Sequence, residues 1–225
     1  MSKAYVLLSG GMDSTTCLAA AIHRFSAEEV TAVSVDYGQR HRKELEHAIR
    51  IADFYGAEWS LLDLSVVIGV GGLTDENLII PHKAYAELPD GISPTYVPFR
   101  NGLMLAALAS KAQADPEANH IYYGAHAEDA ENDAYPDCSI DFINAINVAI
   151  RIGTYEQISL SAPLASMTKV GVVEYGTSLG VPWEMTWSCY EGNELHCGEC
   201  PTCQSRIMAF GDAGVEDPTE YANDQ

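Results

Sequence analysis

The sequence predicts an α/β fold: a doubly wound, mostly parallel five-stranded sheet with helices on both faces, followed by a small cysteine-rich C-terminal segment. Short apolar runs rich in β-branched residues alternate with longer stretches whose apolar residues recur at helical spacing. This alternation implies right-handed crossovers and a parallel sheet. Near the C-terminus, four of the six cysteines fall between residues 189 and 203.

The first part of the sheet follows from three apolar runs and the helices between them. Residues 4–8 are a β-rich strand, and residues 13–23 then place their apolar side chains on one helical face. Residues 30–35 are the second strand and residues 40–55 an amphipathic helix. Residues 58–62 are the third strand.

Residues 65–98 interrupt this alternation, because glycines, the turn pair Asp90-Gly91 and four prolines break regular structure there. We expect a long loop or lid in this stretch, not a linker between domains. Thr168 is the expected N-cap of the last helix. The regular pattern resumes with a helix at residues 100–114, a strand at 121–123, a helix at 139–152, a strand at 157–162 and a helix at 168–179.

Composition limits the function classes. The 225 residues are 47% hydrophobic and 20% charged, as in an ordinary globular protein with a sizeable core. No apolar run is long enough to cross a bilayer and the start of the chain lacks a signal-peptide pattern, so we expect a cytoplasmic protein without a membrane partner. With 32 acidic against 12 basic residues, the net charge of -20 argues against a nucleic-acid partner, because binding phosphates requires Lys and Arg.

The expected organisation has two regions. Residues 1–185 form the α/β domain, which includes the loop or lid at about 65–98, and residues 186–225 form the cysteine-rich C-terminal segment. From Gly211 onward the chain is acidic and contains glycine, so we expect it to be loosely held.

The C-terminal cysteines have the spacing of a zinc site. Two CxxC units share one cysteine, and thiolates at this spacing converge tetrahedrally on Zn²⁺. Disulfides are the alternative, but a reducing compartment disfavours them, and a thioredoxin-type CxxC leaves two cysteines unexplained. His196 is an alternative to one thiolate. A closed four-thiolate site has no open position for water, which favours a structural role for zinc. The expected ligands are Cys189, Cys197, Cys200 and Cys203.

A glycine-rich loop, residues 9–15 with the sequence SGGMDST, joins the first predicted strand to the first predicted helix. Backbone N–H groups at such a turn form an anion site. The loop is neither a Walker loop nor a GxGxxG loop. It is similar to the SGGxDS pyrophosphate loop of the ATP-pyrophosphatase superfamily, whose enzymes split ATP between the α and β phosphates. The nucleotide contacts implied by this similarity are Leu8, Ser9, Gly10, Gly11, Met12, Asp13, Ser14, Thr15, Thr16, Cys17 and Leu18.

Five further motifs occur in order along the chain: DYGQRH at 36–41, VPFRN at 97–101, YPDC at 135–138, TWSCY at 186–190 and CGECPTC at 197–203. Together with the loop they resemble the 7-cyano-7-deazaguanine synthase family of queuosine and archaeosine biosynthesis, over residues 6 to about 210. The resemblance implies an adenine nucleotide alpha-hydrolase-like fold, ATP as co-substrate, Mg²⁺ and structural zinc. It also implies conversion of 7-carboxy-7-deazaguanine and ammonia to 7-cyano-7-deazaguanine through adenylated carboxylate and adenylated amide intermediates.

The resemblance also gives candidate roles. Asp13 is expected to place Mg²⁺ or orient the loop, with helix capping as its other interpretation. Arg100 is expected to clamp a carboxylate or phosphate, with a surface ion pair as the alternative. Asp137 is either an acceptor for the guanine-like N–H edge or a turn residue. The candidate catalytic residues are Asp13, Ser14, Arg100 and Asp137, and the candidate substrate contacts are Tyr37, Arg100, Asn101, Asp129 and Asp137.

Other candidates and functions remain open at this point. His41 and His126 are either proton shuttles or structural residues, and Cys138 is a weak nucleophile candidate because no His adjoins it in sequence. Alternative functions are a related ligase that forms a 7-amido-7-deazaguanine product or protein conjugate, and a zinc-ribbon module that senses nucleotide. Ammonia is expected to come from solution, and a homodimer is compatible with the sequence.

Overall fold

The computed structural model describes residues 2–40 and 42–224, which are organised around one five-stranded sheet. The strand order is β3-β2-β1-β4-β5, and all four strand pairings are parallel. Strand order reverses between β1 and β4, which creates a crevice at the carboxyl ends of these strands. The strands are β1 (Lys3–Leu7), β2 (Val30–Asp36), β3 (Glu58–Asp63), β4 (Ala118–Tyr122) and β5 (Ser159–Ser161).

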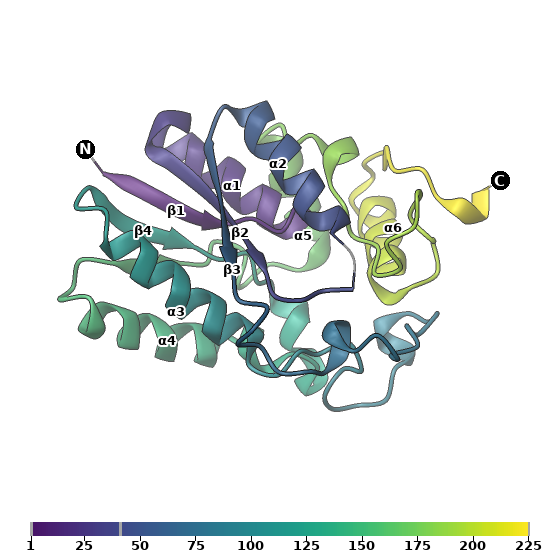
Figure 1. Ribbon diagram of the computed structural model, residues 1–225. Coiled ribbons are helices and arrows are strands. Elements are labelled where there is room, and N and C mark those ends of the chain that lie inside the picture. The colour runs from purple at the N-terminus through teal and green to yellow at the C-terminus, as the bar shows by residue number, and fades with distance from the viewer. Residues whose placement is uncertain (1, 41, 225) are drawn as a thin grey trace.

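Helices cover both faces of the sheet (Figure 1). The alternation of side chains along β1 explains the two layers: Ala4 and Val6 pack into one buried cluster, and Tyr5 and Leu7 pack into the other. One face carries α1 (Met12–Phe25), α2 (Lys43–Tyr55) and α5 (Lys169–Ser178), and the other carries α3 (Arg100–Gln113) and α4 (Ile140–Gly153). The predicted doubly wound fold is therefore confirmed.

Two predicted boundaries are wrong by about a turn. Helix α2 begins at Lys43 and not at residue 40, because the Asp36 carboxylate holds a turn there by accepting hydrogen bonds from the N–H of Gly38 and the guanidinium of Arg42. Strand β4 begins at Ala118 and not at residue 121, because it already pairs with the first residue of β1. Thr168 is the N-cap of α5, as predicted, and its hydroxyl accepts from the N–H of Gly171.

The stretch between β3 and α3 is irregular, as predicted. Residues 65–98 contain only two short 3-10 helices, Gly72–Thr74 and Tyr85–Glu87. Leu73 and Ile80 nevertheless belong to the same buried cluster as α3 and α4, so this loop is packed against the body of the protein. Within the described residues, none of the helices has the length and apolar character needed to span a membrane.

Most residues from Gly211 onward are at least partly exposed, but specific contacts hold this end to the body of the protein, so the expectation of a loosely held end is wrong. Helix α6 (Pro201–Ala213) runs through that glycine. Beyond it, Asp217 accepts hydrogen bonds from Arg206, whose side chain is 0% exposed, and from the hydroxyl of Tyr221 at 2.7 Å. The acidic composition of this end predicted solvent exposure. The prediction fails because the buried guanidinium of Arg206 pairs with the carboxylate of Asp217 and holds it against the protein.

Candidate active site

A cavity of about 560 Å³ lies at the carboxyl edge of the sheet. Segments that are distant in sequence form its wall: the glycine-rich loop, the end of β2, residues 84–93 of the long loop, and the first turns of α3 and α5. The C-terminal segment adds Trp187, Ser188 and part of α6. This is where ligands bind in open α/β sheets.

The glycine-rich loop presents the N-terminus of α1 to this cavity. Gly10 has a positive φ of 87°, and the N-cap Gly11 has no side chain to bind the first-turn amides. Ser14 lies on the inside of the turn, where its hydroxyl donates to the carbonyl of Gly11 at 3.1 Å and accepts from the N–H of Ser9 at 3.1 Å. The loop is therefore held in shape by its own side chains while its amides stay available for an anion.

Gly10 permits a close approach that any other residue prevents. A Cβ at this position would lie 2.5 Å from the carbonyl oxygen of Glu44 and 2.9 Å from the amide nitrogen of Ala48. We expect Gly10→Ala to lower the free energy of unfolding by at least about 1–3 kcal/mol from the left-handed backbone alone, as measured by urea denaturation. Gly153→Ala is the control, since nothing lies within 4 Å of its added methyl group. Equal stability of the two variants would contradict this account.

The predicted nucleotide-contacting stretch divides into two groups. Those that line the cavity are Leu8, Ser9, Gly11, Met12, Asp13 and Ser14. Gly10 and the residues from Thr15 to Leu18 are buried behind them. Thr15 and Thr16 donate their hydroxyls to carbonyls of the preceding turn, and Cys17 and Leu18 pack in the core beneath β1.

Lys169 is a site residue that the sequence analysis missed. Its Nζ lies 2.7 Å from both carboxylate oxygens of Asp13 and 3.2 Å from Nε2 of His126. The same His126 nitrogen lies 3.0 Å from the carboxylate of Asp129. The sequence did contain a signal for this residue. Lys169 directly follows the predicted helix cap Thr168, which places it at the edge of the sheet where the cavity lies. The loop thus has a lysine beside it, supplied from α5.

The network around Lys169 fixes the charge of Asp129. Burial raises the pKa of this carboxyl, but the adjoining His126 and Lys169 outweigh burial and hold the pKa below its ordinary value. His126 is buried, and its Nδ1 has no partner among the described residues. The other histidine candidate, His41, lies outside the described residues.

Arg100 and Tyr37 both line the cavity and contact each other. The guanidinium donates to the Tyr37 hydroxyl at 3.1 Å and lies over its ring at 5.0 Å from the centroid. Arg100 forms no ion pair with any of the side chains that the structure describes, which argues against the surface ion-pair interpretation. Its side chain is half-buried and lines the cavity together with Asn101.

Asp137 is 3% exposed and does not line the cavity. One oxygen accepts from the N–H of Asn101 at 3.0 Å, in the first turn of α3, and burial raises the pKa of the carboxyl. The other oxygen is buried without a partner in the described part of the chain. Cys138 does line the cavity, but burial raises the pKa of its thiol, which leaves it protonated and weakly nucleophilic.

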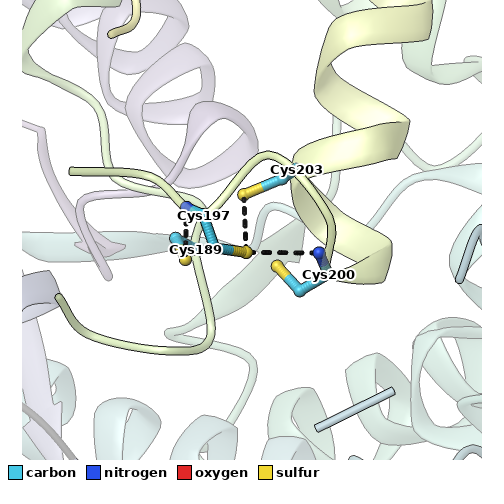
Figure 2. A group of neighbouring side chains, drawn as sticks. All are labelled: Cys189, Cys197, Cys200 and Cys203. Atoms are coloured by element: carbon cyan, nitrogen blue, oxygen red, sulfur yellow. Dashed lines mark hydrogen bonds between the residues drawn. The ribbon is translucent and has the colours of Figure 1, made fainter. Parts of the chain in front are cut away.

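The four C-terminal cysteines form one cluster (Figure 2). Their sulfur atoms all lie within 4.8 Å of one another, and those of Cys197 and Cys203 are 3.9 Å apart. A tetrahedral four-thiolate zinc site with bonds of about 2.3 Å requires sulfurs about 3.8 Å apart. Backbone N–H groups donate to the sulfurs of Cys189 and Cys197, which stabilises thiolates. The donor set therefore fits a tetrahedral thiophilic metal.

His196 is a neighbour of this cluster and not a fifth member. Its Nε2 accepts from the N–H of Ser188 at 3.1 Å, and its ring lies 4.2 Å from that of Trp187. Burial lowers the pKa of His196 to about 4, so the ring is neutral.

Backbone hydrogen bonds connect the cysteine cluster to the glycine-rich loop. The N–H of Trp187 donates to the carbonyl of Gly10 at 2.8 Å, and the Trp187 indole donates to the carbonyl of Cys189 at 2.8 Å. Thr202, between two of the cysteines, donates to the carbonyl of Ser188 at 2.6 Å. The cysteine-rich segment is thus part of the wall that supports the loop.

Solved structures support the fold. An NMN synthetase from Francisella tularensis superposes with a TM-score of 0.50 at 14% identity, covering 95% of this chain and 78% of that protein. At this identity the match concerns the fold alone.

Sequence comparisons identify the family. A 7-cyano-7-deazaguanine synthase from Thermoplasma acidophilum is 41% identical over 97% of this chain and 92% of its own length. Another, from Pseudoalteromonas atlantica, is 38% identical over 98% of this chain and 99% of its own length. The profile of the queuosine biosynthesis protein QueC matches residues 3–214. The resemblance inferred from the motifs is confirmed, and the chain belongs to the QueC family.

Proposed function

We propose that this chain converts 7-carboxy-7-deazaguanine and ammonia to 7-cyano-7-deazaguanine with ATP, through an adenylated carboxylate and an adenylated amide. The observation that carries the proposal is the open N-terminus of α1, with Lys169 beside it, at the wall of a 560 Å³ cavity in a QueC-family chain. Such a site binds the phosphates of a nucleotide next to a substrate of purine size.

Adenylation is needed because a carboxylate is a poor electrophile. Its negative charge repels a nucleophile, and oxide is too basic to leave. Attack of the carboxylate on the α-phosphorus gives a mixed anhydride and releases pyrophosphate. Ammonia then displaces AMP to give the amide. In the second round the amide oxygen attacks the α-phosphorus of a second ATP and releases pyrophosphate. The C–O bond then breaks, AMP leaves with that oxygen, and the two amide N–H protons pass to solvent, which leaves the nitrile.

The residues of the loop hold the departing pyrophosphate. We propose that the amides of Gly11 to Ser14 bind its oxygens and that Lys169 neutralises charge as it develops. Asp13 orients Lys169 through their ion pair. Mg²⁺ is proposed to enter with ATP, with the Asp13 carboxylate as the oxygen donor available to it.

Substrate contacts are proposed around Arg100. Its guanidinium offers two parallel donors to the substrate carboxylate, with Tyr37 and Asn101 beside it. Asp129 holds His126 in position. Asp137 is proposed as an acceptor for the N–H edge of the base, through the oxygen that has no partner among the described residues. This contact requires a shift of the segment that now covers Asp137.

The four cysteines are proposed to hold Zn²⁺ in a structural role. Bound there, the ion crosslinks thiolates and offers no position for water. By holding Cys189 in place, the cluster keeps the neighbouring Trp187 hydrogen-bonded to the loop.

The two-region organisation is proposed on the same basis. Residues 1–185 would bind nucleotide and substrate, residues 65–98 would cover them as a lid, and residues 186–225 would bind metal. The lining of the cavity by residues 84–93 supports the lid. A four-cysteine metal site requires reduced cysteines, which supports a reducing, cytoplasmic location.

Product analysis tests the reaction. Purified protein is incubated with ATP, ammonium and 7-carboxy-7-deazaguanine, and the products are weighed by mass spectrometry. The expected products are the nitrile, AMP and pyrophosphate. Accumulation of the amide alone would support the amide-forming alternative. Release of orthophosphate and ADP, or no consumption of ATP, would contradict the proposal.

A further inference from the structure

Glu44 is a carboxylate inside the cavity that the proposed function does not use. It lies in the first turn of α2, is half-buried and lines the cavity. In the described part of the chain its side chain has no hydrogen bond and no ion pair. Its backbone adjoins the glycine-rich loop, since a Cβ on Gly10 would lie 2.5 Å from the Glu44 carbonyl oxygen. The backbone of Glu44 therefore adjoins the glycine-rich loop, and its side chain belongs to the wall of the cavity that the loop borders.

The groups that face Glu44 come from several elements. Arg100 of α3 interacts with it through charge but without an ion-pair contact, and Tyr37 and Tyr190 line the cavity beside it. Lys43, its neighbour on α2, points away and lies over the Trp187 ring at 5.3 Å. Cys138 is protonated. Burial raises the pKa of Glu44 to about 7, and the charge of Arg100 opposes that rise.

An unpaired carboxylate is unfavourable in this site unless a cation binds to it. Both ATP and the carboxylate substrate are anions, and each is repelled by Glu44. Ammonium is the one reactant that is a cation, and like the Lys ammonium group it keeps its proton at neutral pH. A carboxylate flanked by tyrosine rings suits ammonium, through charge and cation–π contact. Mg²⁺ requires a larger set of oxygen ligands, and Arg100 beside Glu44 is a poor neighbour for it.

We propose that Glu44 binds ammonium in the cavity and removes its proton, so that neutral ammonia attacks the adenylated carboxylate. This proposal rests on the proposed function. The N–H bond of ammonium breaks and its proton moves to a carboxylate oxygen of Glu44. The nitrogen lone pair then forms the C–N bond, the C–O bond to AMP breaks, and AMP leaves with that electron pair. The proton lost from the new C–N nitrogen and the proton held by Glu44 pass to solvent.

The test compares Glu44→Gln with the parent protein and with Glu46→Gln, which changes an exposed glutamate on the same helix. For Glu44→Gln we expect kcat/KM for ammonium to fall by about tenfold or more near neutral pH. In the parent protein, kcat/KM for ammonium should level off above about pH 7, where Glu44 is ionised. In Glu44→Gln, kcat/KM for ammonium should continue to rise by about tenfold per pH unit, because the fraction of unprotonated ammonia rises by that factor. Hydroxylamine is neutral at this pH, so the rate with hydroxylamine as the nucleophile should be the same in the parent protein and in Glu44→Gln.

A separate measurement isolates adenylation. Exchange of labelled pyrophosphate into ATP, with the carboxylate substrate present and ammonium absent, should be the same in the parent, Glu44→Gln and Glu46→Gln. An unchanged ammonium dependence in Glu44→Gln would overturn the proposal. So would a higher KM for the carboxylate substrate, which would make Glu44 a purine contact. If the parent protein itself shows no exchange, the proposed function fails instead.

Discussion

Replacing Lys169 with methionine is expected to lower kcat by about 10²- to 10³-fold, the usual effect of removing one group that stabilises transition-state charge. Lys169 contacts Asp13 at 2.7 Å beside the loop amides, so its positive charge lies where pyrophosphate would separate. Methionine keeps the length and apolar stem of the side chain and removes only the charge. Steady-state formation of AMP and pyrophosphate measures the change.

Two variants give this prediction its controls. Lys111→Met changes a lysine in the last turn of α3, far from the loop, and should leave kcat unaltered. Lys169→Arg keeps a positive charge and should recover part of the rate. If Lys169→Met loses activity only in proportion to a lower melting temperature, then the lysine stabilises the fold and does not act on the phosphates.

Replacing Cys200 with serine is expected to remove the bound metal and to lower the free energy of unfolding by about 4 kcal/mol or more, as the loss of a structural metal does. Cys200 is fully buried in the cluster, and a serine hydroxyl is a much weaker zinc ligand than a thiolate. We also expect a lower kcat, because the Trp187 hydrogen bond to Gly10 depends on this segment. Metal content per chain and urea denaturation measure the two effects.

The matched control is Cys138→Ser, which lies outside the cluster and should retain one zinc per chain. Metal analysis of the parent protein tests whether the cluster binds zinc. One equivalent of zinc supports the assignment, whereas iron or no metal contradicts it. Zinc retained at full occupancy in Cys200→Ser would show that three thiolates suffice.

The sheet and most of its helices could be predicted because they depend on local periodicity. The alternation along β1 directs Ala4 and Val6 to one layer and Tyr5 and Leu7 to the other, and the same alternation is visible in the sequence. The four cysteines were predictable for a similar reason, since metal ligands at short spacing form a local pattern.

Partnerships between distant residues could not be predicted. Lys169 and Asp13 are in contact although they are 156 positions apart in the sequence, and no local sequence pattern predicts such a contact. The burial of Arg206, which holds Asp217, likewise depends on how α6 packs. For the site, the sequence supplied the residue types at the loop and at Arg100, but it could not show that Glu44 lines the cavity and Asp137 does not.

The hydrogen bond from Trp187 to Gly10 limits how the chain can be divided. A truncation after residue 185 would keep every strand of the sheet but remove the donor that faces the Gly10 carbonyl, together with Trp187 and Ser188 from the cavity wall. We therefore expect a chain truncated after residue 185 to lose the support of its glycine-rich loop. In engineering or domain-exchange experiments, the cysteine-rich end has to be transferred together with the loop it supports.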